Sequence, residues 1–133
     1  MRAAGAVQYK QVDTHSHVES ANPHQLITML LVGALDNIAV AKGCLSRGDM
    51  EGKCQNISRA ISIIGVLEDS LNKEVGGELS DNLANTYQYL SRRLYEANRH
   101  NDTELLDEGT KLLKIVKTSW DGIEQEANKI YEK

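Results

Sequence analysis

Histidine is a residue type that can bind a metal ion or accept a phosphoryl group, and this 133-residue chain contains four. Of the four histidines, His15, His17 and His24 lie close together in the sequence and His100 stands alone. A protein metal site needs three or four converging ligands held by further hydrogen bonds. His15 and His17 fall in a stretch without helical or strand period, and no Glu-x-x-His pair marks a di-iron bundle. We therefore expect no metal and no cofactor.

A histidine phosphotransfer domain is the alternative function that these residues leave open, because such a domain is a four-helix bundle of this size. It needs an exposed His in the middle of a helix, beside a small residue and a Lys. His24 falls in the first turn of a predicted helix, and His100 falls at the end of another. Neither setting matches this requirement. A signalling relay of this kind is therefore kept only as the alternative hypothesis.

Other catalytic arrangements are missing from the sequence, which has no phosphate loop, G-x-G-x-x-G, G-x-S-x-G, H-E-x-x-H or C-x-x-C. Cys44 and Cys54 flank a predicted turn at Asp49, and we expect them to be reduced core residues. Arg92 and Arg93 resemble an anion site, but their spacing to Glu96 favours a solvated helix face. We expect no catalytic residue and no enzyme.

Composition and charge narrow the class further. A net charge of −4 provides no basic field to hold nucleic acid or an anionic membrane. The N-terminal residues contain no apolar run of signal-peptide length. The apolar run over 26–45 is interrupted by four polar residues and is not expected to insert into a membrane; these are Thr28, Asp36, Asn37 and Lys42. We expect a cytoplasmic protein.

Four amphipathic segments follow a tail of residues 1–21 that has no sustained period. The spacing of apolar residues predicts helices over about 22–45, 50–74, 79–99 and 102–131. Asn22 and Pro23 suit the start of the first helix, and Gly48 suits the turn after it. Three short connections favour antiparallel neighbours. The prediction is therefore an all-α, up-down four-helix bundle, one domain over 22–133, with the N-terminal tail packed on it.

Each predicted helix has one stripe for the core. The expected stripes are Ile27, Leu30, Leu31, Ala34, Ile38, Ala41 and Leu45; Met50, Cys54, Ile57, Ile61, Ile64 and Leu71; Leu83, Tyr87, Leu90, Leu94 and Ala97; and Leu105, Leu112, Val116 and Trp120.

The first helix has more apolar surface than one packing contact needs. A second face carries Leu26, Met29, Val40 and Cys44. Further apolar residues lie off the stripes of the other helices: Ile63, Val66, Tyr89, Tyr95 and Ile115. A contiguous set of such residues would mark a partner surface. The tail could also fold over this surface through Tyr9. Both uses stay open at this point.

The stretch "NPHQLITMLLVGAL" resembles the S-P-x-x-L-I-x-x-L-(Y/F)-(D/E)-G-A motif that opens the first helix of the flagellin export chaperones, the FliS family. "GDMEGKCQNISRAISII" resembles that family's second helix, and "GGELSDNLANTYQYLSRRLYEANRHND" its Gly-Gly turn and third helix. Trp120 and Tyr9 also match family positions, so the likeness runs from about Gln8 to Trp120. Leu31 and Val32 depart from it, since they replace an aromatic and an acidic residue, and so does Thr86.

The resemblance implies a bacterial cytosolic chaperone. Such proteins bind the C-terminal segment of flagellin, which is disordered in the monomer, prevent premature polymerisation and assist delivery to the flagellar type III export gate. The resemblance adds Tyr9 and Tyr87 to the client-binding residues, although Tyr87 could instead belong to the core. The expected client-binding set is Tyr9, Leu26, Met29, Val40, Ile63, Val66, Tyr87, Tyr89 and Tyr95.

A first prediction concerns the tail. Deleting residues 1–20 should increase the fluorescence of an apolar dye, because the tail would no longer cover the second face of the first helix. Circular dichroism should show an unchanged helical content. An unchanged dye signal would mean that the tail covers no apolar surface.

Overall fold

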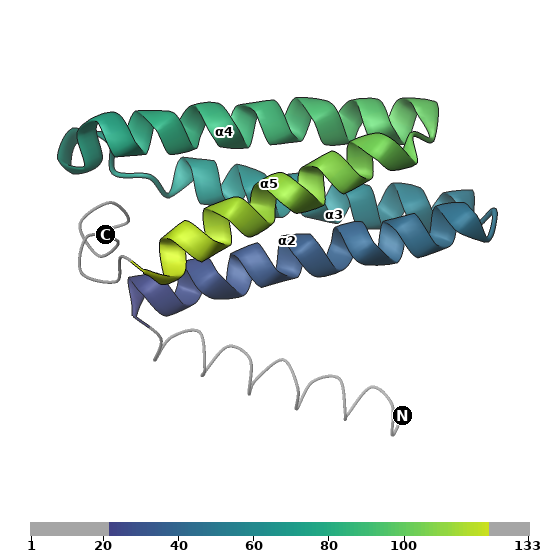
Figure 1. Cartoon of the computed structure of the whole chain (residues 1–133), viewed down its shortest axis with the longest axis horizontal. Coiled ribbons are helices and arrows are strands. Elements are labelled where there is room, and N and C mark those ends of the chain that lie inside the picture. The colour runs from purple at the N-terminus through teal and green to yellow at the C-terminus, as the bar shows by residue number, and fades with distance from the viewer. Residues whose placement is uncertain (1–21, 123–133) are drawn as a thin grey trace, which may run out of the picture.

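The structure, a computed structural model, describes residues 22–122 apart from the side chains of residues 73–75. Four helices account for this part of the chain: α2 (Pro23–Ser46), α3 (Met50–Asp69), α4 (Lys73–His100) and α5 (Thr103–Asp121). α2 packs against α3 and α5, and α4 packs against the same two helices (Figure 1). The predicted all-α, up-down four-helix bundle is confirmed.

The helices begin where side chains satisfy their free N–H groups. Asn22 Oδ1 accepts a hydrogen bond from the backbone N of Gln25 at 2.8 Å, and the Gln25 side chain accepts one from the backbone N of Asn22 at 3.1 Å. The side chains of Asp49 and Asp102 cap α3 and α5 by accepting hydrogen bonds from backbone N–H groups in the first turn of each helix. Gly48, with φ of 76°, makes the turn between α2 and α3. These starts agree with the sequence prediction.

Two helix ends differ from the prediction. α3 ends at Asp69 rather than near residue 74, and α4 already begins at Lys73. The Gly-Gly pair lies within α4, and Gly77 (φ 55°, ψ −129°) interrupts its helical backbone, as the sequence predicts for this pair. A glycine can adopt this conformation because it has no Cβ. α5 ends at Asp121 with Gly122 as its cap, and the predicted continuation to residue 131 lies outside the described residues.

The core is aliphatic apart from Tyr87 and Trp120. Its buried members are Ile27, Leu31, Ala34, Ile38, Ala41, Cys44, Ile57, Ala60, Ile64, Leu67, Leu71, Ala84, Leu90, Leu94, Ala97, Leu106, Leu113 and Val116, together with those two aromatic residues.

Two predicted stripes were placed wrongly. At the start of α3, Met50 and Cys54 are exposed and Lys53 is buried instead, so the prediction that both cysteines are core residues is wrong for Cys54. In α5 the fully buried leucines are Leu106 and Leu113, one position after the expected pair. Leu105 and Leu112 pack against the edge of the core.

Lys53 is a buried cation that sequence patterning treats as a surface residue. Its Nζ donates hydrogen bonds to the backbone O of Asn98 at 2.8 Å and to Oδ1 of Asn101 at 2.6 Å. The aliphatic stem of a lysine can lie along apolar surface while its amine reaches polar partners. Lys53 therefore ties α3 to the turn between α4 and α5, where Asn101 has a φ of 53°.

Replacing Lys53 with Met tests this contact. Lys53→Met keeps the stem but leaves two acceptors without their donor, which should lower the free energy of unfolding by about 1–3 kcal/mol. Urea denaturation followed by circular dichroism measures the loss. Lys114→Met, at an exposed position of α5, is the matched control and should change stability little. Equal stability of the two variants would contradict the proposed tie.

Candidate functional site

The described residues hold no group of three or more His, Cys, Asp or Glu side chains that could bind a metal. His15 and His17 lie outside the described part of the chain. His100 stands at the end of α4, where its Nε2 lies 3.1 Å from Glu96 Oε2.

His24 joins the beginning of α2 to the end of α5. Its Nε2 lies 2.9 Å from the backbone O of Trp120, so this nitrogen carries the proton and donates it. Trp120 Nε1 donates in return to the backbone O of His24 at 3.2 Å. The two rings are stacked, with centroids 5.1 Å apart. This ring is engaged within the fold, unlike the exposed mid-helix His that phosphotransfer requires.

The second face of α2 meets α3 beside Gly33, and nearer the turn Gly52 of α3 lies too close to α2 to carry a side chain. A Cβ on Gly33 would lie 3.4 Å from Cδ1 of Ile63, and a Cβ on Gly52 would meet the side chain of Cys44. Leu26, Met29 and Val40 lie seven or four residues from Gly33, so they share its side of α2.

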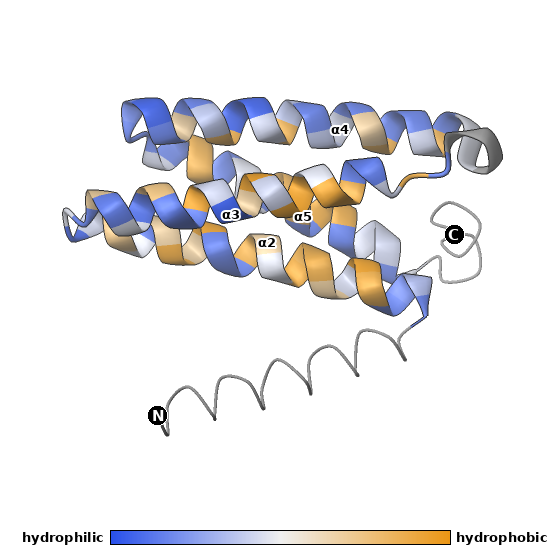
Figure 2. Cartoon of the chain, turned by 180° about the vertical axis from the view of Figure 1, so that it is seen from behind, coloured by the Kyte–Doolittle hydropathy of each residue, from blue (hydrophilic) through white to orange (hydrophobic). Residues whose placement is uncertain are grey.

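These residues form what we call the α2–α3 surface: Leu26, Met29, Val40, Ile63 and Val66. Val40 and Val66 are each 50% exposed, and the other three are half-buried. Figure 2 shows hydrophobic residues along much of α2. The surface is apolar and its members carry no charge.

Ile63 occupies a different position from the one that periodicity suggested. It packs against the core instead of standing free of it, and its Cδ1 lies beside Gly33 of α2. Val66, one helical turn further along α3, is the more exposed residue.

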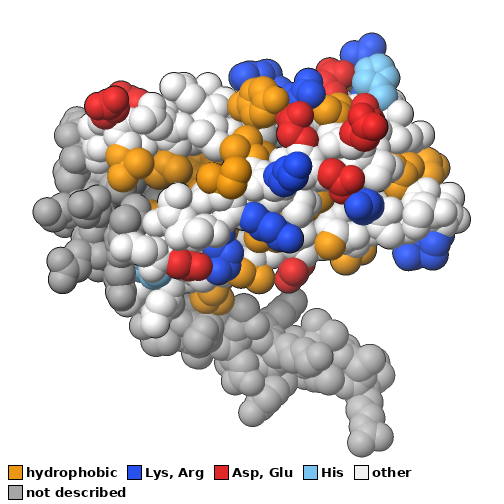
Figure 3. Space-filling model, viewed as in Figure 1, with side chains coloured by type: hydrophobic (Ala, Val, Ile, Leu, Met, Phe, Trp, Pro, Cys, Tyr) orange, Lys and Arg blue, Asp and Glu red, His pale blue; other side chains and the backbone are white. Residues whose placement is uncertain are grey.

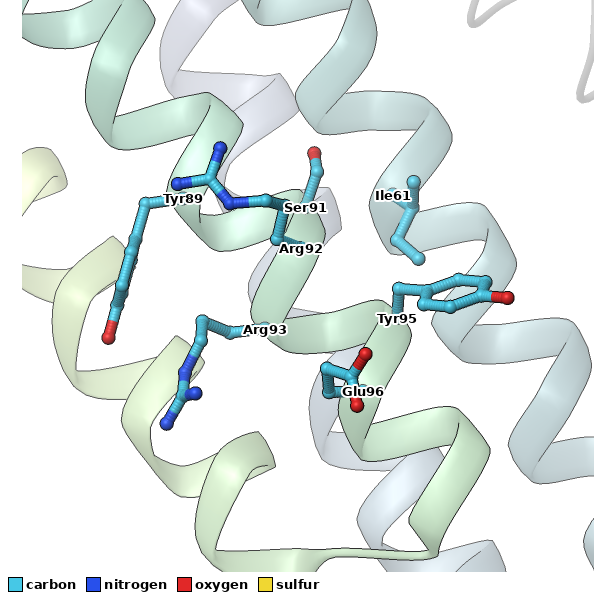
Figure 4. A pocket seen from close by; sticks show the side chains of 7 residues that line it. All are labelled: Ile61, Tyr89, Ser91, Arg92, Arg93, Tyr95 and Glu96. Carbon is cyan, nitrogen blue, oxygen red and sulfur yellow. The ribbon is translucent and has the colours of Figure 1, made fainter.

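The tyrosines of α4 fall into two environments. Tyr87 is only 1% exposed and lies in the core, one of the two roles held open for it. Tyr95 is 60% exposed and Tyr89 39% exposed, and both line a shallow depression on the outside of α4 (Figure 4). In that view Tyr95 points toward Ile61 of α3, whereas Tyr89 points toward α5.

A network of polar contacts holds Tyr89 in place. Its Oη donates to Glu108 Oε1 at 2.7 Å, and Arg93 donates to both oxygens of the same carboxylate at 2.9 and 3.3 Å. The Arg93 guanidinium also lies over the Tyr89 ring, 5.7 Å from its centroid. Side chains of both charges lie close together on this face (Figure 3). The hydrogen bond to Glu108 raises the pKa of Tyr89, and the bonds from Arg93 and Tyr89 lower the pKa of Glu108.

The predicted client-binding residues therefore do not form one patch. Ile63 lies against α2, while Ile61, two residues earlier, lies in the depression beside α4. The α2–α3 surface and the α4 depression are thus on opposite edges of α3. Tyr9 lies outside the described residues. Val32 and Leu79 are further exposed apolar residues, each 38% exposed, that were not among the predicted client-binding residues. Plotting every apolar residue of α2 on a helical wheel would have shown that Val32 lies off the core stripe.

An all-helical bundle that offers apolar surfaces, and no metal-ligand cluster among its described residues, has the features of a protein-binding module. The chain belongs to the FliS family, since the family model "Flagellar protein FliS" matches residues 5–127. It is 48% identical to the flagellar secretion chaperone FliSB of Pseudomonas aeruginosa over 87% of this chain and 92% of that one. It is 40% identical to the flagellar secretion chaperone FliS of Salmonella typhimurium, over 95% and 94%. The predicted family is confirmed.

The polar network predicts how Tyr89 titrates. In Glu108→Gln, the carboxylate that opposes ionisation is gone while Arg93 still favours it, so the pKa of Tyr89 should fall. An NMR titration of the Tyr89 ring signals measures this pKa. Asp107→Asn removes a neighbouring carboxylate that pairs with Lys42 instead, and it should leave the titration unchanged. A Tyr89 pKa that moves equally in both variants would contradict the network.

Proposed function

We propose that this protein is an export chaperone that binds the C-terminal segment of flagellin in the bacterial cytosol. It would prevent premature polymerisation and assist delivery to the flagellar type III export apparatus. Membership of the FliS family supports the proposal, and so do relatives named flagellar secretion chaperones. The observation that carries it is the α2–α3 surface, which is apolar beyond what the core requires.

The chemistry of this surface suits a client that becomes helical on binding. An amphipathic helix docks by placing apolar residues from successive turns into a groove between two helices. We infer that Leu26 and Met29 on α2, with Ile63 and Val66 on α3, would contact such a helix, because each of them is partly or fully accessible at the surface. A disordered client pays the cost of ordering when it binds. Burial of apolar area must offset this entropy cost, and a surface of uncharged apolar residues provides such area.

The length of α2 does not require a membrane. It is the single helix among the described residues that is long and apolar enough to cross a bilayer by length and composition. Six of its residues are buried in the bundle, where α3 and α5 pack on it. The core helix of a soluble protein meets the same criteria. We therefore propose a cytosolic protein that works without membrane insertion, cofactor or covalent chemistry.

The N-terminal tail and the export gate complete the proposal. Residues 1–21, with Tyr9, would cover part of the α2–α3 surface and give way to the client. Asn22, where the described chain begins, stands directly before α2, so a cover on that helix needs no long connection. The loaded chaperone would then meet the flagellar export gate as its second partner.

Val66 provides the sharpest test of this function. Val66→Asp places a charge in the groove and should weaken binding of a peptide copying the flagellin C-terminus by at least about fivefold. Isothermal titration calorimetry measures the dissociation constant. The melting temperature should change little, since the Val66 side chain is half exposed.

Ile115→Asp is the matched control, because Ile115 is 61% exposed on α5, a helix that contributes nothing to the groove. It should bind the peptide normally. Ile63→Asp should lower the melting temperature, since Ile63 packs against the core. Normal binding by Val66→Asp would show that the client lies elsewhere.

A further inference from the structure

The outer side of α4 carries two exposed guanidinium groups that make no ion pair within residues 22–122: those of Arg92 and Arg99. Arg93, by contrast, is bound to Glu108. Because Arg92 and Arg99 are seven residues apart, they lie on one side of α4 about 10.5 Å from each other along the axis. Two free cations at this spacing match carboxylates two turns apart on another helix.

Between the two arginines lies an apolar contact point. Tyr95 is exposed and points toward Ile61 of α3 (Figure 4). On the α3 side of the depression, Gly65 adds no side chain, and a Cβ there would meet no atom within 4 Å. The α3–α4 face thus has an apolar centre at Tyr95 and Ile61, and Arg92 and Arg99 lie on α4 about one turn before and one turn after Tyr95. In Figure 4 the Arg92 side chain extends toward Tyr89, away from α3.

The carboxylates closest to this face are already engaged. Glu96, which lines the depression, lies with its Oε2 3.1 Å from His100 Nε2, a pair that is ionic only when the histidine is protonated. Glu68 accepts a hydrogen bond from Gln88 Nε2 at 2.7 Å. Each guanidinium still has a full set of donors in a planar fork, which suits a carboxylate. A partner that supplies carboxylates would make contacts that the protein does not make internally.

We propose that the α3–α4 face docks a helix of a second protein, other than the client, that bears two carboxylates two turns apart and an apolar residue between them. The carboxylates would meet Arg92 and Arg99, and the apolar residue would pack on Tyr95 and Ile61. This mode combines helix-in-groove contact with charge complementarity, which favours specificity and rapid association.

The position of the face separates it from the client surface. Exposed Ser58 and Ser62 lie on the outside of α3, between the α3–α4 face and Val66. A helix in the α2–α3 groove would therefore leave the α3–α4 face free. A second copy of the chain is a poor occupant, because a two-fold pairing of this face with itself would bring guanidinium groups against guanidinium groups.

A pair of designed peptides tests the proposal. One is an alanine-based peptide of about 18 residues, long enough for a helix, with two Glu seven positions apart and a Leu between them. The other has Gln in place of both Glu. Titration into the folded protein, followed by NMR, should move the signals of Tyr95, Ile61 and Arg92. The Glu peptide should bind at least about fivefold more tightly than the Gln peptide, and roughly 0.5 M salt should reduce that advantage.

Charge reversal supplies the matched variants. Arg92→Glu with Arg99→Glu should abolish the advantage of the Glu peptide. Arg59→Glu makes the same kind of change at an exposed arginine of α3 and should preserve it. Circular dichroism confirms that each variant is folded. The proposal is wrong if the Gln peptide binds as well as the Glu peptide, if neither binds at about 1 mM, or if the arginine double variant keeps the advantage.

Two further measurements decide the occupant. A saturating flagellin C-terminal peptide should leave the dissociation constant of the Glu peptide unchanged; competition between the two would assign this face to the client instead. Sedimentation should show no self-association that depends on Arg92 and Arg99. Such self-association would assign the face to a second copy and overturn the proposal. Neither result depends on whether Val66 binds flagellin.

Discussion

The close contact between α2 and α3 determines which side chains this bundle buries and which it presents. Ile63 lies beside Gly33 at ordinary contact distance, and nearer the turn Gly52 lies so close to Cys44 that a side chain on it would clash. Leu26 and Met29 are partly buried, whereas Val40 is exposed. The apolar surplus of α2 thus remains accessible beside its contact with α3.

The sequence predicts the parts of this fold that depend on local chemistry. Asn22, Asp49 and Asp102 mark helix starts because a side-chain oxygen at that position satisfies backbone N–H groups. The buried stripe of α2 follows from its period. The buried Lys53 could not be predicted in this way, because its burial depends on contacts with α4 and the following turn, which lie far away in the sequence.

The candidate site shows the same division. Periodicity identified residues that lie off the core stripes, and Val66, Tyr89 and Tyr95 are indeed exposed. Periodicity could not tell that these residues belong to two surfaces, because that depends on which neighbour each side of α3 faces. Periodicity also could not predict that Arg93 forms an ion pair whereas Arg92 forms none among the described residues. Adjacent in sequence, they differ because α5 brings Glu108 to one of them only.

The contact between His24 and Trp120 brings the beginning of α2 next to the end of α5. The first and the last of the four described helices therefore meet at these ends. The order of the helices along the chain could thus be changed without changing how they pack. The exposed turn at Gly48 could hold the new termini, and a short linker could join residues 22 and 122. A circularly permuted chain of this kind would keep both surfaces of α3 intact.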